Sequence, residues 1–265
     1  MMDYCFPNSF ENIDNIFDSH AHFDDSRFES DRDELLSTLK NTQGVVGIIN
    51  CASDYKSSVF SLQLAKKHDF VYAAVGYHPE SVSTDTPDLN ALEELLKSGE
   101  AVAVGEIGLD YYWNPEQAEI QKHYFKQQIK LASKYNLPII VHDRDAHADT
   151  VEILKEFKPS GVLHCFSGSV EMAKDIVNLG MYIGVGGVLT FKNAKKLPDV
   201  VKEIPMDRIL LETDAPYMAP EPFRSKTNHS GLIIYVAKKI AEIKNLPVEE
   251  VLSITRRNAE KLFLN

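Results

Sequence analysis

Short runs of apolar and β-branched residues alternate along the whole chain with stretches of helical periodicity, and this alternation constrains the fold more than any other feature. Runs this apolar are typical of parallel strands that are covered by helices on both faces. They predict eight strands, at residues 16–20, 45–51, 71–76, 102–106, 138–142, 161–165, 181–185 and 208–213. Eight strands, each followed by a helix, predict a TIM-type (β/α)₈ barrel of the α/β class.

The segments between these strands show the three- and four-residue apolar spacing of helices. We expect helices at residues 31–42, 56–68, 88–98, 115–135, 147–157, 169–179 and 194–203, and two more at 232–244 and 248–262. A doubly wound sheet alternates in the same way, but it seldom needs eight units, and no Gly-x-Gly-x-x-Gly follows a strand here. We therefore expect one barrel domain over residues 1–265, with residues 1–15 as an N-terminal extension and an extra C-terminal helix.

Charge and composition exclude several classes of protein. The net charge of −11 argues against a broad basic face for nucleic acid, so a polyanion has to be met locally, where divalent cations reverse the potential. No run approaches the length of a membrane span, and the first residues carry no export signal. The three cysteines are scattered and lack C-x-x-C spacing, which fits reduced thiols. We expect a cytoplasmic protein and favour a monomer.

Metal-capable side chains stand at the ends of five predicted strands, namely His20, Glu106, His142, His164 and Asp214. The carboxyl ends of barrel strands converge on one face, where active sites are built. His22 joins this set, because alternate side chains of an extended segment point the same way. Each residue alone has a plainer interpretation, such as a core histidine or a Glu106–Arg144 ion pair. Their shared position favours one or two divalent cations, and the ligand types do not choose among magnesium, manganese and zinc.

Three carboxylates in or beside this set have predicted roles. Glu106 follows a buried apolar run, where an unpaired carboxylate is costly, and its two oxygens can bridge two cations. Asp214 can bind a cation, orient the attacking water and accept its proton. Glu212 is interpreted as support for the site, with a structural salt bridge as the alternative.

Aromatic and polar residues in the adjacent loops suit an elongated anionic substrate. The aromatic set comprises Tyr77, His78, Tyr111, Tyr112, Trp113 and Phe166. Such side chains either stack on bases or pack between a loop and a helix. The loop after the eighth strand carries Arg224, Lys226 and Asn228, which either hold phosphate oxygens or form a solvated charged loop.

Six motifs, in order, resemble the TatD family of metal-dependent deoxyribonucleases. They are Phe-Asp-Ser-His20-Ala-His22, Gly76-Tyr-His78-Pro79, Gly105-Glu106-Ile-Gly-Leu-Asp110, Val-His142-Asp-Arg144, His164-Cys-Phe-Ser-Gly168 and Glu212-Thr-Asp214-Ala-Pro216. The resemblance runs from about Phe17 to Phe263 and implies a barrel of the amidohydrolase superfamily. It implies that one cation is held by His20, His22 and Asp214, a second by His142 and His164, and both by Glu106.

The resemblance also implies hydrolysis of DNA phosphodiesters, as a 3′–5′ exonuclease on single strands or ends. His78 and Arg224 match residues near the substrate phosphate, and we add Tyr112 and Asn228 as candidate substrate contacts. The chain departs from the family pattern in the loop after the eighth strand. Ser225 stands where glycine is usual, and His229-Ser230 stands where an acidic or other residue and a proline are usual.

Two other functions remain open. The first is hydrolysis of another ester or an amide, including deacylation of D-aminoacyl-tRNA. Members of the superfamily that cleave amides or organophosphates often carry a carboxylated lysine where this chain has Glu106, which favours the nuclease branch. The second is a catalytically silent protein that binds metal or nucleic acid, and the presence of all six candidate ligands argues against it.

Overall fold

A computed structural model describes residues 4–6, 14–84 and 86–265, and it shows a barrel of eight parallel strands in sequential order. The strands are β1 (Ile16–Ala21), β2 (Val45–Cys51), β3 (Val71–Val75), β4 (Ala101–Asp110), β5 (Ile139–Arg144), β6 (Gly161–Leu163), β7 (Tyr182–Val185) and β8 (Ile209–Leu211). A parallel bridge between Ala21 and Ala215 joins the two edges, and the His22 amide donates to the Ala215 carbonyl at 2.7 Å. The predicted (β/α)₈ barrel is therefore confirmed.

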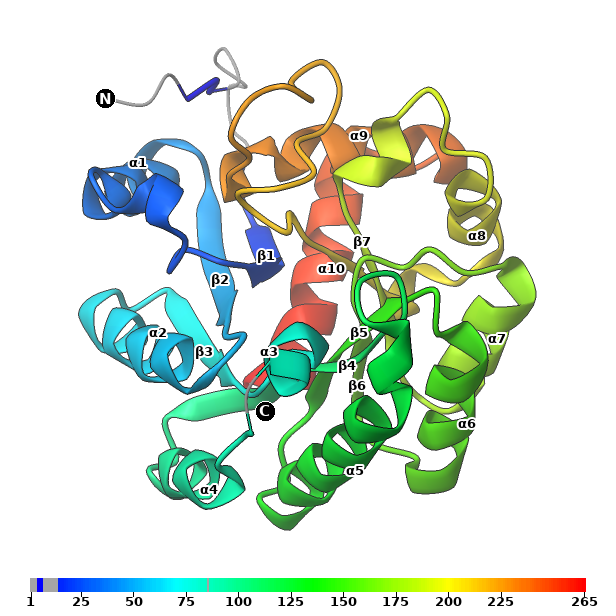
Figure 1. Ribbon diagram of the computed structural model, residues 1–265. Helices are drawn as coiled ribbons and strands as arrows, with labels where there is room; N and C mark the ends of the chain where they lie inside the picture. The colour runs from blue at the N-terminus through cyan, green and yellow to red at the C-terminus, as the bar shows by residue number, and fades with distance from the viewer. Residues whose placement is uncertain (1–3, 7–13, 85) are drawn as a thin grey trace.

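Helices fill the connections and surround the strands (Figure 1). They are α1 (Arg32–Thr42), α2 (Tyr55–Lys67), α3 (Pro79–Thr84), α4 (Leu89–Lys97), α5 (Ala118–Lys134), α6 (His147–Phe157), α7 (Val170–Asn178), α8 (Leu197–Glu203), α9 (Ile233–Lys244) and α10 (Val248–Phe263). Short 3₁₀ turns are η1 (Ser26–Phe28), η2 (Pro115–Gln117), η3 (Gly187–Thr190), η4 (Met206–Arg208) and η5 (Ser230–Leu232). Each helix that the sequence predicts is present within a few residues of its expected bounds.

Several differences from the predicted elements affect the barrel mouth, and two of them are that β6 and β8 end at Leu163 and Leu211, two residues earlier than predicted. Strand β4 continues to Asp110, and its pairing with β5 shifts register between Val104 and Ile107, so Glu106 lies at an irregularity within the strand rather than at its end. The helix expected from residue 194 begins at Leu197, which leaves residues 194–196 in the loop. Helix α3 was not predicted, and it begins at Pro79, whose fixed φ suits a first helical position.

Side-chain caps fix where several helices begin. Asp54 and Ser57 form a capping box at the start of α2, and Asp88 accepts from two backbone amides at the start of α4. Ser169 accepts from the Met172 amide at the start of α7. A cap of this kind is worth about 1 kcal/mol.

The barrel interior is filled by one apolar layer to which every strand contributes. Its members include Phe17, Ile49, Ala74, Ala103, Ile140, Val162, Tyr182 and Leu210. Three residues of α10 join this cluster, Ala259, Leu262 and Phe263, so the C-terminal helix covers the amino-terminal end of the barrel. In Figure 1 this helix, in red, lies across the middle of the view. The opposite end, where the strands finish, is left for the site.

Part of the expected N-terminal extension packs against the barrel. The Tyr4 hydroxyl donates to Asp31 at 2.9 Å, and the Phe6 ring lies 5.0 Å from the ring of His229. Residues 1–3 and 7–13 of the extension lie outside the described residues. Within the described part of the chain, we find no helix that is long and apolar enough to cross a membrane.

Candidate metal centre and active site

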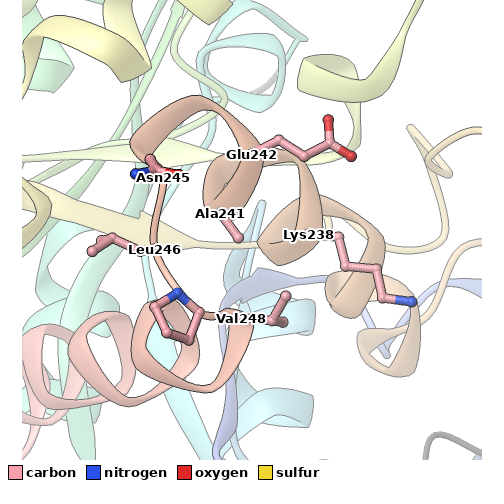
Figure 2. A pocket seen from close by; sticks show the side chains of 7 residues that line it. Lys238, Ala241, Glu242, Asn245, Leu246 and Val248 are labelled. Carbon is pink, nitrogen blue, oxygen red and sulfur yellow. The ribbon is translucent and has the colours of Figure 1, made fainter.

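Two depressions of similar size differ sharply in chemistry. One lies where α9 meets α10 and is lined by seven residues, among which Lys238 and Glu242 carry charge (Figure 2). The other, here called the metal cavity, opens at the carboxyl ends of the strands and has a volume of about 580 Å³. Its walls include His22, His78, Glu106, His142, His164 and Asp214. The concentration of imidazoles and carboxylates places the candidate site in the metal cavity.

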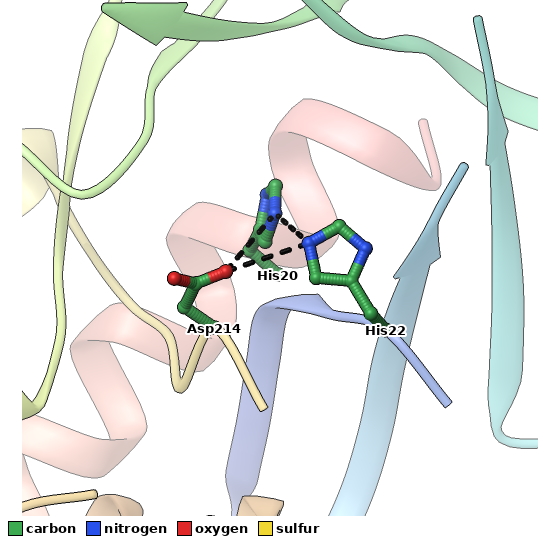
Figure 3. Close-up of side chains that lie close together, drawn as sticks. All are labelled: His20, His22 and Asp214. Carbon is green, nitrogen blue, oxygen red and sulfur yellow. Dashed lines mark hydrogen bonds and ion pairs between the residues drawn. The ribbon is translucent and has the colours of Figure 1, made fainter. Parts of the chain in front are cut away.

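The first group of ligands joins the two ends of the barrel sheet. His20 lies in β1, His22 directly follows that strand, and Asp214 comes three residues after the end of β8. Their imidazole Nε2 atoms lie 3.0 Å apart, and Asp214 Oδ1 lies 3.8 Å from that of His20 and 3.4 Å from that of His22. Figure 3 shows the three side chains facing one another. Two nitrogens and one oxygen therefore surround a single point, as a divalent cation requires.

The second group is formed around the carboxylate of Glu106. Its Oε1 lies 2.9 Å from His142 Nδ1 and 2.7 Å from His164 Nε2. Its Oε2 lies 3.2 Å from His20 Nε2 and 3.5 Å from His22 Nε2. Each oxygen thus faces one pair of histidines, which is the arrangement of a carboxylate that bridges two cations.

His78 lies close to the candidate metal ligands Glu106 and His142. Its Nε2 lies 3.7 Å from Glu106 Oε1, and its ring lies 4.4 Å from that of His142, nearly edge-on. Donor atoms of these three residues all lie within 4.8 Å of one another. His78 therefore reaches the reacting region from the β3 side of the mouth.

Opposite charges balance within the centre. Burial raises the pKa of Glu106, but the surrounding histidines outweigh that effect and hold it well below its usual range. Burial lowers the pKa of His22, yet Asp214 and Glu106 raise it to about 10, and in the same way Asp110 and Glu106 raise the pKa of His142 to about 10. The neighbouring carboxylates therefore favour the protonated form of several imidazoles, including that of His164, and a cation must displace these protons to bind.

A buried carboxylate below the centre holds the first ligand group together. Asp18 accepts hydrogen bonds from the Thr213 hydroxyl at 2.6 Å and from the Ser230 hydroxyl at 2.7 Å. Burial raises the pKa of Asp18 to about 6 despite these bonds. Because the Asp214 amide also donates to the His20 carbonyl at 2.9 Å, ligands almost two hundred residues apart are fixed relative to each other.

Asp110 is a site residue to which the sequence analysis assigned no role. Its Oδ2 lies 3.0 Å from His142 Nε2, while its Oδ1 accepts from the backbone amides of Tyr112 and Trp113 at 3.0 Å each. It therefore orients a ligand and shapes the loop after β4. The four-residue spacing from Glu106, on one strand, was a signal that pointed to it.

Glu212 supports the second ligand group through the backbone. Its Oε1 accepts from the amide of Cys165, the residue after His164, at 2.5 Å. Its Oε2 has no hydrogen-bond partner among the described residues, and burial raises its pKa to about 8. The close approach depends on Gly184, because a Cβ there would lie 2.1 Å from that oxygen. The interpretation as support for the site agrees with this contact.

The loop after β4 presents aromatic side chains at the rim of the cavity. Tyr112 and Trp113 are 53% and 57% exposed. The Arg144 guanidinium carbon lies 4.0 Å from the Tyr112 ring centre and 5.6 Å from that of Trp113. The alternative of a Glu106–Arg144 ion pair is therefore wrong, since Glu106 pairs only with histidines within the described ranges. Arg144 and Trp113 both line the metal cavity.

Other aromatic candidates pack rather than face the cavity. Tyr77 is buried and its hydroxyl donates to the Asp88 carbonyl at 3.3 Å, and the Tyr111 hydroxyl donates to Asp149 at 2.7 Å. Phe166 is buried but lines a second hollow beside the metal cavity. Packing between loop and helix, the alternative left open from sequence, holds for the two tyrosines.

The loop after β8 is arranged differently from the expectation. Asn228 is fully buried, and its amide donates to the carbonyls of Thr213 at 2.8 Å and Tyr217 at 2.7 Å, so it positions the loop and has no surface for a substrate. Arg224 is exposed, and its guanidinium lies 4.0 Å over the Phe191 ring. Arg224 does not belong to the walls of the metal cavity or of the hollow beside it, as these are formed by the described residues.

Known proteins are similar to this chain in both sequence and fold. Residues 17–264 match the family described as TatD related DNase. The metal-dependent hydrolase YabD of Bacillus subtilis is 43% identical over 252 residues, which cover 94% of this chain and 98% of that protein. The metal-dependent hydrolase YcfH of Escherichia coli K12 is 38% identical over 254 residues, which cover 94% and 95% respectively.

Solved structures of TatD proteins have a similar fold over nearly their whole length. The TatD homologue YJJV of Escherichia coli K12 superposes with a TM-score of 0.87 at 33% identity, covering 95% of this chain and 98% of that one. A TatD family hydrolase of Entamoeba histolytica superposes with a TM-score of 0.81 at 25% identity, covering 94% and 98%. The similarity extends over nearly the full length of each chain.

Proposed function

The chain belongs to the TatD family of metal-dependent hydrolases, and on this basis we propose that it is a deoxyribonuclease that cleaves DNA phosphodiester bonds. The observation that carries the proposal is the position of Glu106, whose two oxygens face two separate groups of donors. The proposal includes 3′–5′ digestion of single strands or ends by a monomeric cytoplasmic enzyme.

The donor sets fit two divalent cations. His20, His22 and Asp214 would hold one, His142 and His164 the other, and Glu106 both. Magnesium, manganese and zinc are all compatible with imidazole and carboxylate ligands. When bound, such cations favour deprotonation of water and offset the negative charge that develops on phosphoryl oxygens.

Asp214 is suited to accept the proton of the attacking water. Burial raises its pKa, but His22 and the other histidines outweigh burial and lower the pKa below its usual value. The carboxylate is therefore ionised at neutral pH. Its Oδ1 faces His20 and His22, so the carboxylate would lie beside a water that is activated by a cation on these ligands.

Two residues beside the ligands can position the phosphate. Burial lowers the pKa of His78 to about 3, so its imidazole is neutral and can donate one hydrogen bond to a phosphoryl oxygen. Arg144 lies at the rim, where its guanidinium can pair with an adjacent phosphate in the fork geometry that this side chain favours. Together these two residues would orient the phosphate at the site.

The direct test is hydrolysis of a labelled single-stranded oligonucleotide by metal-stripped protein that is then supplied with magnesium, manganese or zinc. A 5′ label distinguishes the shortening ladder of 3′–5′ digestion from internal cleavage. The matched control is Asp214→Asn, measured for metal content as well as activity, and we expect it to release no nucleotides.

The second candidate function is hydrolysis of another ester or an amide, and the apolar hollow next to the metal cavity is the observation that favours it. The same metal-loaded protein is therefore assayed with a D-aminoacyl-tRNA and a simple aryl ester. Cleavage of these without cleavage of DNA would refute the deoxyribonuclease and leave the metal centre in place.

A further inference from the structure

A second hollow, here called the side arm, opens from the metal cavity. Its volume is about 530 Å³, and His142, His164 and Asp214 belong to the walls of both. Its floor includes the buried side chains of Phe166 and Leu197. A group bound in the side arm would therefore be joined directly to the group that reacts at the metal centre.

The rim of the side arm comes from the loops after β7 and β8. Asn193, Lys195 and Lys196 are exposed on the loop between β7 and α8, and Met218, which is 43% exposed, lies on the loop after β8. The walls thus combine an apolar floor with an amide, two ammonium groups, the Arg144 guanidinium and the Asp143 carboxylate, which pairs with His147 at 2.7 Å. This combination suits a flat heterocycle that is attached to an anion.

The two lysines differ from those on the outer helices. Lys126, Lys155 and Lys174 each pair with a carboxylate, at 2.8, 2.7 and 3.1 Å. Lys195 and Lys196 form no ion pair within residues 4–6, 14–84 and 86–265. In a protein with a net charge of −11, two unpaired cations beside the catalytic centre are a local site for an anion.

We propose that the side arm binds the nucleoside next to the scissile phosphate of a single DNA strand, with Lys195 and Lys196 on the neighbouring phosphate. This inference rests on the proposed nuclease function and adds where the strand lies. The base would stack on Phe166 and Met218 and offer its polar edge to Asn193. The hollow, at about 530 Å³, has room for such a nucleoside.

An acyl group from an ester substrate is the other candidate occupant. It would fill the apolar floor, but it carries no negative charge for Lys195 and Lys196. A nucleotide accounts for both parts of the side arm, because its base would fill the apolar floor and the neighbouring phosphate would pair with the two lysines.

The test separates binding from cleavage. Binding of a fluorescent single-stranded oligonucleotide is measured by anisotropy over a range of salt concentrations, with each protein in the Asp214→Asn background. The test variant is K195A/K196A. The control variant is K130A/K202A, which removes the same charge from exposed lysines in the second half of α5 and the last turn of α8.

We expect K195A/K196A to weaken binding about tenfold at low salt and to reduce the slope of log Kd against log salt by about 0.7, the value for one lost phosphate contact on a single strand. The control should change neither. Equal effects of the two variants would overturn the side-arm proposal while DNA cleavage by the unmodified enzyme still stood. A folded, metal-loaded enzyme that neither binds nor cleaves the oligonucleotide would overturn both proposals.

A second measurement tests the base rather than the phosphate. Binding of an intact oligonucleotide is compared with binding of oligonucleotides in which the terminal or the next nucleotide is abasic. We expect the unmodified side arm to bind the intact oligonucleotide about tenfold more tightly than one of the two abasic forms, and Met218→Ala to remove most of that preference. A preference that Met218→Ala leaves unchanged would place the base elsewhere.

Discussion

The metal centre and the rim around it are held in opposite ways. His20, Glu106 and His164 are buried, at 0%, 3% and 5% exposure, and they lie within a strand or directly after one. Tyr112 and Trp113 of the rim are more than half exposed and lie on a loop. The centre is therefore organised before any substrate arrives, whereas the rim can differ between relatives without disturbing the chemistry.

This difference predicts a hierarchy of effects. A change in the centre alters several ligands at once, because Glu106 contacts four imidazoles that all belong to the candidate cation sites. A change in the rim removes one contact with the substrate. We expect effects on the chemical step from the first kind and effects on affinity from the second.

The largest effect is expected from Glu106→Gln. The amide cannot bridge two cations, so we expect kcat/KM to fall on the order of a thousandfold or more and the bound metal to decrease. Metal content and kcat/KM are measured together, with Glu152→Gln on the exposed face of α6 as the control. A variant that keeps two cations and more than a tenth of the activity would contradict the bridging role.

The next prediction concerns the stability of the fold rather than its activity. His229 is buried, with Nδ1 lacking a partner among the described residues, and burial lowers its pKa to about 4. Because the unfolded chain binds this proton near pH 6.5 and the folded chain does not, stability falls as the pH drops from 6.5 towards 4. The expected loss at pH 5 is about 2 kcal/mol, as an order of magnitude.

Urea unfolding at pH 7 and pH 5 measures this loss, with His229→Gln as the comparison. The variant should lose about 2 kcal/mol less between the two pH values than the unmodified chain. Equal losses would show that His229 does not couple the pH to folding, and that Tyr4 and Phe6 pack around it for shape alone.

The same difference explains what the sequence could and could not predict. Candidate ligands such as His20 and His164 were placed together correctly because the ends of parallel barrel strands converge whatever loops follow them. The length of β4 was missed because its second part pairs with β5 beyond an irregularity that apolar periodicity does not reveal. Local pattern therefore sufficed for the residues that the strands carry.

Loop residues were predicted less well because their positions depend on contacts that are distant in sequence. Asn228 is a polar residue in a charged loop, and only the folded chain shows that Thr213 and Tyr217 use both of its amide hydrogens. The sequence predicted that Asn228 binds substrate, whereas its hydrogen bonds in the folded chain show that it stabilises the loop after β8. Helix α3 is a similar case, since six residues are too few for a clear periodic signal.

A smaller effect is expected from the aromatic part of the rim. Trp113→Ala removes a surface on which a base can stack, and we expect KM for a single-stranded oligonucleotide to rise about tenfold with little change in kcat. Trp113→Phe keeps a stacking surface and should recover most of the affinity. If the two variants behave alike, Trp113 acts through the packing of the loop and not by stacking.

The smallest effect is expected from Arg224, and it tests whether the rim is described correctly. Its guanidinium lies over Phe191 and outside the two cavities formed by the described residues, so Arg224→Ala should raise KM by less than about threefold. Arg144→Ala is the matched arginine inside the metal cavity and should raise KM about tenfold. If Arg224→Ala raises KM more than Arg144→Ala does, the loop after β8 must move over the substrate during binding. The contrast between a fixed metal centre and a rim that only adds single contacts would then be wrong.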